Sequence, residues 1–363
     1  MKSTLERTII KVAMAGERAF SNLSGGKRQP RVIEPYVGLA TPSELVLKGR
    51  VHSDLTDIQV NPRQGRLQNT RQMIRRFMTS EVGGAEVTCG DHSAVTDEEG
   101  YFELRLPRDS ETGWVEREVV LSANGTTAIC PVLSARSGPG TMVISDIDDT
   151  VMRTGAYTLV KNLWTSFTGN VLTRQIFSDA AVLMHRLHDG GNRPVVFLSS
   201  SPWNIHGFLQ DVFAHASVVR GPMFLRDLGL SETKLITEGH GNHKGDAIDT
   251  ILASIPDRQA ILMGDTGKKD AVIYREAILR HGGRIAAVVL RTPGPGIEAD
   301  DERAIRLLRE IGVSVFCGRS FAEFSDDVVS IADEPIRQQA AEKPPEKSRT
   351  LAVSIGTAPA PKS

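Results

Sequence analysis

The chain has 363 residues, of which 40% are hydrophobic and 24% are charged, and its formal net charge at pH 7 is -1. This composition is that of an ordinary globular protein with room for two domains. The balanced charge argues against a dedicated nucleic-acid binder, which would carry a strong basic excess. No apolar run approaches membrane-spanning length, and we expect no signal peptide.

Three cysteines, Cys89, Cys130 and Cys317, are too few for a secreted disulfide framework. They favour a reducing compartment, so we expect a cytoplasmic location. A bridge between Cys89 and Cys130 is conceivable, but simple burial of the thiols is the interpretation we favour.

Residues 1–30 predict an amphipathic helix followed by a linker. Apolar residues recur at helical spacing between Thr4 and Leu23, and glycine and proline interrupt the pattern from Gly25 to Pro30. Such a helix could anchor the chain at a membrane surface. Short amphipathic helices more commonly bury one face on their own domain, and we favour that alternative.

Residues 31–138 predict a small β-sandwich accessory domain, because short alternating runs are separated by turn residues. The predicted strands are 45–51, 85–89, 101–106, 117–121 and 127–132. Between the first two lies a basic helical insert with Arg63, Arg66, Arg71, Arg75 and Arg76. This insert could face an anionic lipid surface or an acidic partner, although a solvated arginine face is the commoner explanation.

Residues 139–332 predict an α/β domain with a Rossmann-like parallel sheet and helices on both faces, because apolar strands and helical patterns alternate. After the strand that begins near Met142, the predicted strands are 194–199, 217–220, 260–265 and 284–290. The predicted helices are 180–188, 204–214, 244–254, 270–280 and 301–310. Aromatic residues between Thr150 and Ala180 form either a small apolar cap over the site or the core of a packed helix. Residues 333–363 are rich in polar residues and proline, which predicts a disordered tail.

The stretch from Met142 to Val151 is the centre of the functional prediction. An apolar run ends in three carboxylates, Asp146, Asp148 and Asp149, which is typical of a buried strand that delivers acids to the carboxyl edge of a parallel sheet. Crowded carboxylates repel one another unless they are solvated, protonated or neutralised by a cation. We therefore expect a Mg²⁺ site at this edge.

Three further stretches fall at predicted strand ends or helix starts of the same sheet, and together they could supply the parts of a phosphoryl-transfer site. On this hypothesis Asp146 is the nucleophile, and Asp148 protonates the leaving alcohol and later activates water. Phosphate oxygens would be bound by Thr150, Ser199 and Lys244. The predicted Mg²⁺ ligands are Asp146, Asp148, Asp265 and Asp270.

These motifs, in this order, resemble the four motifs of haloacid-dehalogenase-like phosphatases. The resemblance is closer to the phosphatidate phosphatase family of the actin-patch-protein type, and it rests on four stretches: Asp146–Thr150, Ser199–Trp203, His243–Lys244 and Gly264–Asp270, the last followed by Ile273–Tyr274. It covers residues 141–324. Ala271 replaces a proline frequent in the family, and Thr266 and Lys268 stand where serine and glutamine are common.

The family implies Mg²⁺-dependent hydrolysis of phosphatidate to diacylglycerol and phosphate. A phospholipid substrate would require peripheral contact with a membrane surface on its cytoplasmic side.

Two alternatives stay open: a phosphatase of another bulky phosphomonoester, and a catalytically vestigial protein that binds membranes or partners. A phospho-acceptor receiver is disfavoured by the second acid, Asp148. A serine hydrolase is disfavoured because Ser199–Ser201 lacks the Gly-x-Ser-x-Gly elbow. The histidine pairs His185/His188 and His240/His243 are better explained as surface residues than as metal ligands.

Overall fold

The structure is a computed structural model, and it describes residues 31–53, 82–153, 176–226, 243–294 and 296–334. The predicted amino-terminal helix, the basic insert, most of the predicted cap and nearly all of the predicted tail lie outside these residues. Two compact units divide the chain: the first is made mainly of residues 1–134, and the second mainly of residues 135–156, 173–203 and 208–363. Each unit is described by itself.

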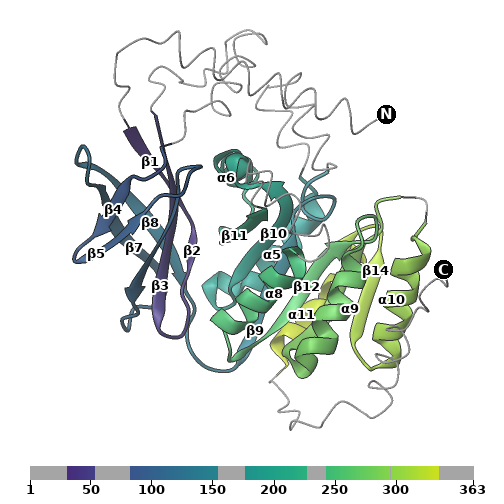
Figure 1. The fold of residues 1–363 in the computed structure, drawn as a ribbon. Coiled ribbons are helices and arrows are strands. Elements are labelled where there is room, and N and C mark those ends of the chain that lie inside the picture. Colours follow the sequence, from purple (N-terminus) through teal and green to yellow (C-terminus); the bar gives the residue numbers. More distant parts are fainter. Residues whose placement is uncertain (1–30, 54–81, 154–175, 227–242, 295, 335–363) are drawn as a thin grey trace, which may run out of the picture. The chain divides into compact units, whose positions relative to one another are not determined.

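The first unit contains two sheets (Figure 1). A three-stranded antiparallel sheet has the order β1-β3-β6, with β1 at Arg31–Tyr36, β3 at Glu44–Ser53 and β6 at Tyr101–Pro107. A five-stranded sheet has the order β2-β8-β7-β4-β5, with β2 at Gly38–Leu39, β8 at Thr126–Ser134, β7 at Gly113–Leu121, β4 at Glu86–Cys89 and β5 at His92–Val95. Its pairings are antiparallel except that of β2 with β8, which is parallel.

One hydrophobic core joins the two sheets of the first unit. Leu45 and Leu104 come from the smaller sheet, and Val119 and Val132 come from the larger one. Along β6 buried and exposed residues alternate, which is the period-two pattern of a strand with one face on a core. The predicted antiparallel β-region is therefore confirmed. All three cysteines are free thiols, and Cys130 is buried in this core.

The second unit is built on a six-stranded parallel sheet with the order β11-β10-β9-β12-β13-β14. In chain order its strands are β9 at Gly140–Asp146, β10 at Val195–Pro202, β11 at Met223–Arg226, β12 at Arg258–Asp265, β13 at Ile285–Arg291 and β14 at Ser314–Gly318. The helices are α5 at Ser178–His188, α6 at His206–His215, α8 at His243–Ser254, α9 at Asp270–His281, α10 at Ala299–Glu310 and α11 at Ser325–Asp333. Figure 1 shows these helices flanking the sheet, so the predicted α/β class is confirmed.

The strand order places a reversal in the middle of the sheet. From β9 the chain proceeds outward to β10 and β11, and it then returns to β12 and continues to β13 and β14 on the other side. Open parallel sheets bind their ligands at the carboxyl ends of the strands beside such a reversal, here β9 and its neighbours β10 and β12. Strand β9 is buried from Thr141 to Asp146, because helices cover a parallel sheet on its faces.

One predicted strand is wrong: the chain forms no strand at residues 217–220. Ser217 has φ +53° just after α6, and the strand begins later, at Met223. A Cβ atom on Gly221 would lie 2.1 Å from the carbonyl oxygen of Val195, so this glycine lets the incoming chain approach β10 closely. Among the described residues, no helix combines the length and apolar character needed to cross a membrane.

Candidate active site

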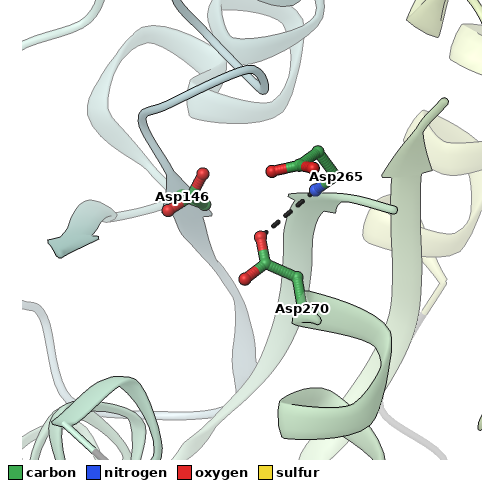
Figure 2. A group of neighbouring side chains, drawn as sticks. All are labelled: Asp146, Asp265 and Asp270. Atoms are coloured by element: carbon green, nitrogen blue, oxygen red, sulfur yellow. Dashed lines mark hydrogen bonds between the residues drawn. The ribbon is translucent and has the colours of Figure 1, made fainter. Parts of the chain in front are cut away.

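Three buried aspartates meet at the carboxyl ends of β9 and β12. Asp146 ends β9, Asp265 ends β12 and Asp270 begins α9, and each offers an oxygen within 4.8 Å of the others (Figure 2). Strands β9 and β12 are in register up to the pair Ser145 and Met263, so they deliver their final acids to the same edge. The amide of Asp265 donates to Asp270 Oδ2 at 3.2 Å, which fixes the loop that separates the two acids.

Lys244 brings a cation into this group of acids. It is the second residue of α8, and its side chain is 6% exposed. Its Nζ lies 2.7 Å from Asp146 Oδ1 and 2.5 Å from Asp270 Oδ1. Burial lowers the pKa of Lys244, but the charges of Asp146 and Asp270 outweigh burial and raise that pKa well above its usual value. Lys244 is therefore a fixed positive charge at the site.

A single ammonium does not neutralise three buried carboxylates. Burial raises the pKa of Asp265 to about 8, and the nearby charges of Asp270 and Asp146 act in the same direction. Burial also raises the pKa of Asp146 to about 6, against the opposing effect of Lys244. Asp265 Oδ2 is buried and has no hydrogen-bond partner among the described residues. A compact set of carboxylate oxygens with one unsatisfied atom fits a hard divalent cation such as Mg²⁺.

Asp148 lies beside this cluster, and two serines of β10 bind its carboxylate. Ser199 Oγ donates to Asp148 Oδ2 at 2.8 Å, and Ser201 Oγ donates to the same oxygen at 3.3 Å. Burial and the charge of Asp146 raise the pKa of Asp148 to about 6. A carboxyl group with such a pKa is partly protonated near neutral pH, as a general acid must be. The prediction that Asp148 also binds the metal stays a prediction.

Thr150 closes a tight turn after β9. Its Oγ1 donates to Asp146 Oδ2 at 3.3 Å, and the amides of Val151 and Met152 donate to the carbonyl of Ile147 at 3.0 and 2.9 Å. Asp149 within the turn has φ +61°, a left-handed conformation that aspartate tolerates better than most residues. The structure thus brings together every predicted site residue, although Thr150 and Ser199, predicted to bind phosphate, here donate to Asp146 and Asp148.

Sequence reasoning gave no role to three residues that line or support the site. Ser201 shares a strand face with Ser199, so the period of two along β10 could have identified it. Lys268 forms an ion pair with Asp149, with 2.7 Å between Nζ and Oδ2. Tyr274 Oη donates to the carbonyl of Met263 at 2.6 Å and packs α9 against β12. Lys268 and Tyr274 lie in the stretch that carries the family resemblance, but the sequence did not indicate which residues they contact.

Comparison with known proteins finds similarity in the segment that holds this site. Residues 141–292 match the family model of the catalytic domain of the phosphatidate phosphatase APP1. A Saccharomyces cerevisiae protein named Phosphatidate phosphatase APP1 is 26% identical over 152 residues, which cover 42% of this chain and 26% of that protein. Residues 141–292 are therefore similar to this phosphatidate phosphatase catalytic-domain family.

A second relative, an uncharacterized Schizosaccharomyces pombe protein, is 30% identical over 162 residues, or 42% of this chain and 25% of that protein. The matched segment thus spans about a quarter of each relative. The segment that matches the family model includes every predicted site residue, from Asp146 to Asp270.

Proposed function

We propose that the protein is a Mg²⁺-dependent phosphatase that hydrolyses phosphatidate to diacylglycerol and phosphate through an aspartyl-phosphate intermediate. One observation carries the proposal. Within a segment of the phosphatidate phosphatase catalytic-domain family, Asp146, Asp265, Asp270 and Lys244 converge at the switch point of the sheet. The family match supports the reaction class, and the site geometry supports a role for each residue.

The first step would transfer the phosphoryl group to Asp146. A carboxylate oxygen of Asp146 attacks phosphorus, and the bond between phosphorus and the lipid oxygen breaks. Asp148 gives its proton to that departing oxygen, so that diacylglycerol leaves as a neutral alcohol. The raised pKa of Asp148 favours its protonated form, and hydrogen bonds from Ser199 and Ser201 would hold its carboxyl group in place.

The second step would release phosphate and restore Asp146. Water attacks the phosphorus of the acyl phosphate and gives a proton to the Asp148 carboxylate, and the bond between phosphorus and Asp146 breaks. Lys244 stays fixed by Asp270, from where its ammonium can attract phosphate oxygens. Asp146, Asp265 and Asp270 would hold Mg²⁺, which would supply positive charge against the negative charge of the phosphate.

The choice of phosphatidate rests on the family and on the name of the Saccharomyces cerevisiae relative. A phospholipid substrate would bring the protein to a membrane surface, so we propose peripheral association on the cytoplasmic side. The basic insert with Arg71, Arg75 and Arg76 is the candidate lipid-facing segment. It lies outside the described residues, and its role is proposed from sequence alone.

The test is phosphate release from phosphatidate in mixed micelles, beside water-soluble phosphomonoesters, with Mg²⁺ or with a chelator. We expect Mg²⁺-dependent turnover that favours phosphatidate, and no turnover by Asp146→Asn. Turnover of soluble esters alone would overturn the lipid assignment and leave the mechanism intact. No turnover of any substrate would favour a vestigial binding protein and overturn the proposal.

A further inference from the structure

A buried arginine ends β13, the strand that pairs with β12. Arg291 is 2% exposed, and its guanidinium lies over the rings of Phe177 and Phe321, with Cζ at 3.9 and 4.2 Å from their centroids. A buried guanidinium is costly unless its donors are satisfied, so its partners indicate what it holds in place.

The partners of the Arg291 side chain include the turn that follows the proposed nucleophile. Its Nε donates to the carbonyl of Thr150 at 3.2 Å, and its Nη1 donates to the carbonyl of Arg319 at 3.0 Å. Its Nη2 donates to both carboxylate oxygens of Asp179, at 3.0 and 3.1 Å. Each nitrogen therefore has a defined partner, and one of these partners is the backbone of the catalytic turn.

The backbone of Arg291 contacts the loop that runs from Asp265 to Asp270. Its carbonyl accepts from the amide of Thr266 at 2.9 Å, and Arg291 is the register partner of Asp265 in the pairing of β12 with β13. One residue thus joins the turn after Asp146 to the loop after Asp265. Phe177 adds a third contact, because its amide donates to the carbonyl of Val151 at 2.9 Å.

We infer that Arg291 is a positioning residue that sets the distance between the Asp146–Thr150 turn and the Asp265–Asp270 loop. The inference deepens the proposed function and rests on it for its kinetic consequences. Lysine cannot replace the planar guanidinium of Arg291. Its ammonium offers all its donors from one atom, so it cannot form hydrogen bonds with Thr150 and Asp179 at the same time. Misplacement of reacting groups by about 1 Å can slow a reaction about 10²-fold.

Arg258 provides a matched control at the opposite edge of the same sheet. It is 8% exposed, and its Nη1 donates to the carbonyls of Thr141 at 3.1 Å and Asn192 at 2.8 Å. It therefore also fixes backbone carbonyls from a buried position, but at the amino end of β12, away from the acids. Variants at Arg258 report the effect of losing a buried structural arginine.

The experiment compares Arg291→Met and Arg291→Lys with Arg258→Met and Arg258→Lys in the full chain, normalised to the folded fraction. For Arg291→Met we expect kcat to fall about 10²-fold while KM changes less than about threefold. The kcat of Arg291→Lys should fall less than that of Arg291→Met, and both Arg258 variants should keep the wild-type kcat. Wild-type kcat in folded Arg291→Met would overturn the inference, and so would failure of both Arg291 variants to fold while the Arg258 variants fold.

Amide hydrogen exchange supplies a second readout that does not depend on activity. In Arg291→Met the peptide that spans residues 147–152 should exchange about tenfold faster, with little change in the strands of the sheet. An equal increase throughout the second unit would overturn the inference. If the wild-type protein releases no phosphate, the proposed function fails, and exchange in the 147–152 peptide alone decides whether Arg291 holds the turn.

Discussion

Asp146 and Asp149 lie in one turn, yet their surroundings predict opposite consequences of substitution. Asp146 is fully buried between Lys244 and the other acids, whereas Asp149 is 24% exposed in its side chain and pairs with Lys268. Asp146→Asn should lower kcat by about 10⁴-fold or more, because the nucleophile is lost. Asp149→Asn should lower kcat less than about tenfold, because a partly exposed ion pair contributes little and asparagine tolerates positive φ. Phosphate release at saturating substrate measures both; similar losses would contradict these assignments.

Three residues with chemistry of their own could be predicted from the sequence because each stands at the end of a strand or the start of a helix: Asp146, Lys244 and Asp265. Ser199 was predicted to end its strand, but β10 continues past it to Pro202. Arg291 also ends a strand, but an arginine there has no single expected role. Its importance comes from contacts with Thr150 and Asp179, which are far away in sequence, and no local pattern encodes them.

At the level of elements, the site depends on close contact between β12 and α9. A Cβ atom on Gly264 would lie 2.7 Å from both Asp270 Oδ2 and Tyr274 Oη. Gly264→Ala should therefore displace Asp270 and lower the free energy of unfolding by about 1–3 kcal/mol, the usual cost of overpacking. We also expect Mg²⁺ to raise the melting temperature of this variant less than that of the wild type. Equal Mg²⁺-induced shifts in a thermal melt would rule out a role for Asp270 in metal binding.

The start of α5 gives a prediction for pH. Burial alone would raise the pKa of Asp179, but hydrogen bonds from Ser320 and Phe321 and the charge of Arg291 hold it below the usual value of 3.8. A depressed pKa in the folded state stabilises the fold at pH values above 3.8, and this stabilisation is lost as the pH falls through the folded pKa.

Asp179→Asn should accordingly lower the free energy of unfolding by about 2 kcal/mol at pH 7. The difference from the wild type should shrink as the pH falls below 4. Urea unfolding followed by circular dichroism, at pH 7 and at a pH below 4, measures this difference in the free energy of unfolding. A difference that stays constant with pH would mean that the charge of Asp179 contributes nothing.

The strands that form the centre of the sheet could also be predicted, whereas the edge strand β11 could not be placed. Val218 and Val219 have strand propensity, but the left-handed Ser217 and the close approach of Gly221 to β10 delay the strand until Met223. Here the path by which the chain returns to the sheet overrides the local strand propensity of the two valines. Central strands are long, apolar and bounded by acids or turns, so their pattern is unambiguous.

For the whole molecule, hydrolysis of phosphatidate would require contact with lipid. We expect the full chain to co-sediment with vesicles that contain phosphatidate, and to do so less strongly at high salt. Neutralising Arg71, Arg75 and Arg76 together should weaken binding, while turnover of a soluble phosphomonoester stays unchanged. Binding unaffected by the triple substitution would remove the basic insert from the proposed membrane contact.

Trapping the phosphorylated enzyme tests directly whether Asp146 is the nucleophile. In Asp148→Asn, an aryl phosphate still forms the acyl phosphate, because an aryl alcohol leaves without a proton, but water is no longer activated. We expect a burst of about one equivalent of aryl alcohol per site and, by mass spectrometry, a phosphoryl group on the side chain of Asp146. A phosphoryl group on another residue would contradict nucleophilic catalysis by Asp146, and so would the absence of phosphorylated Asp146 in Asp148→Asn when the wild type turns over the same aryl phosphate.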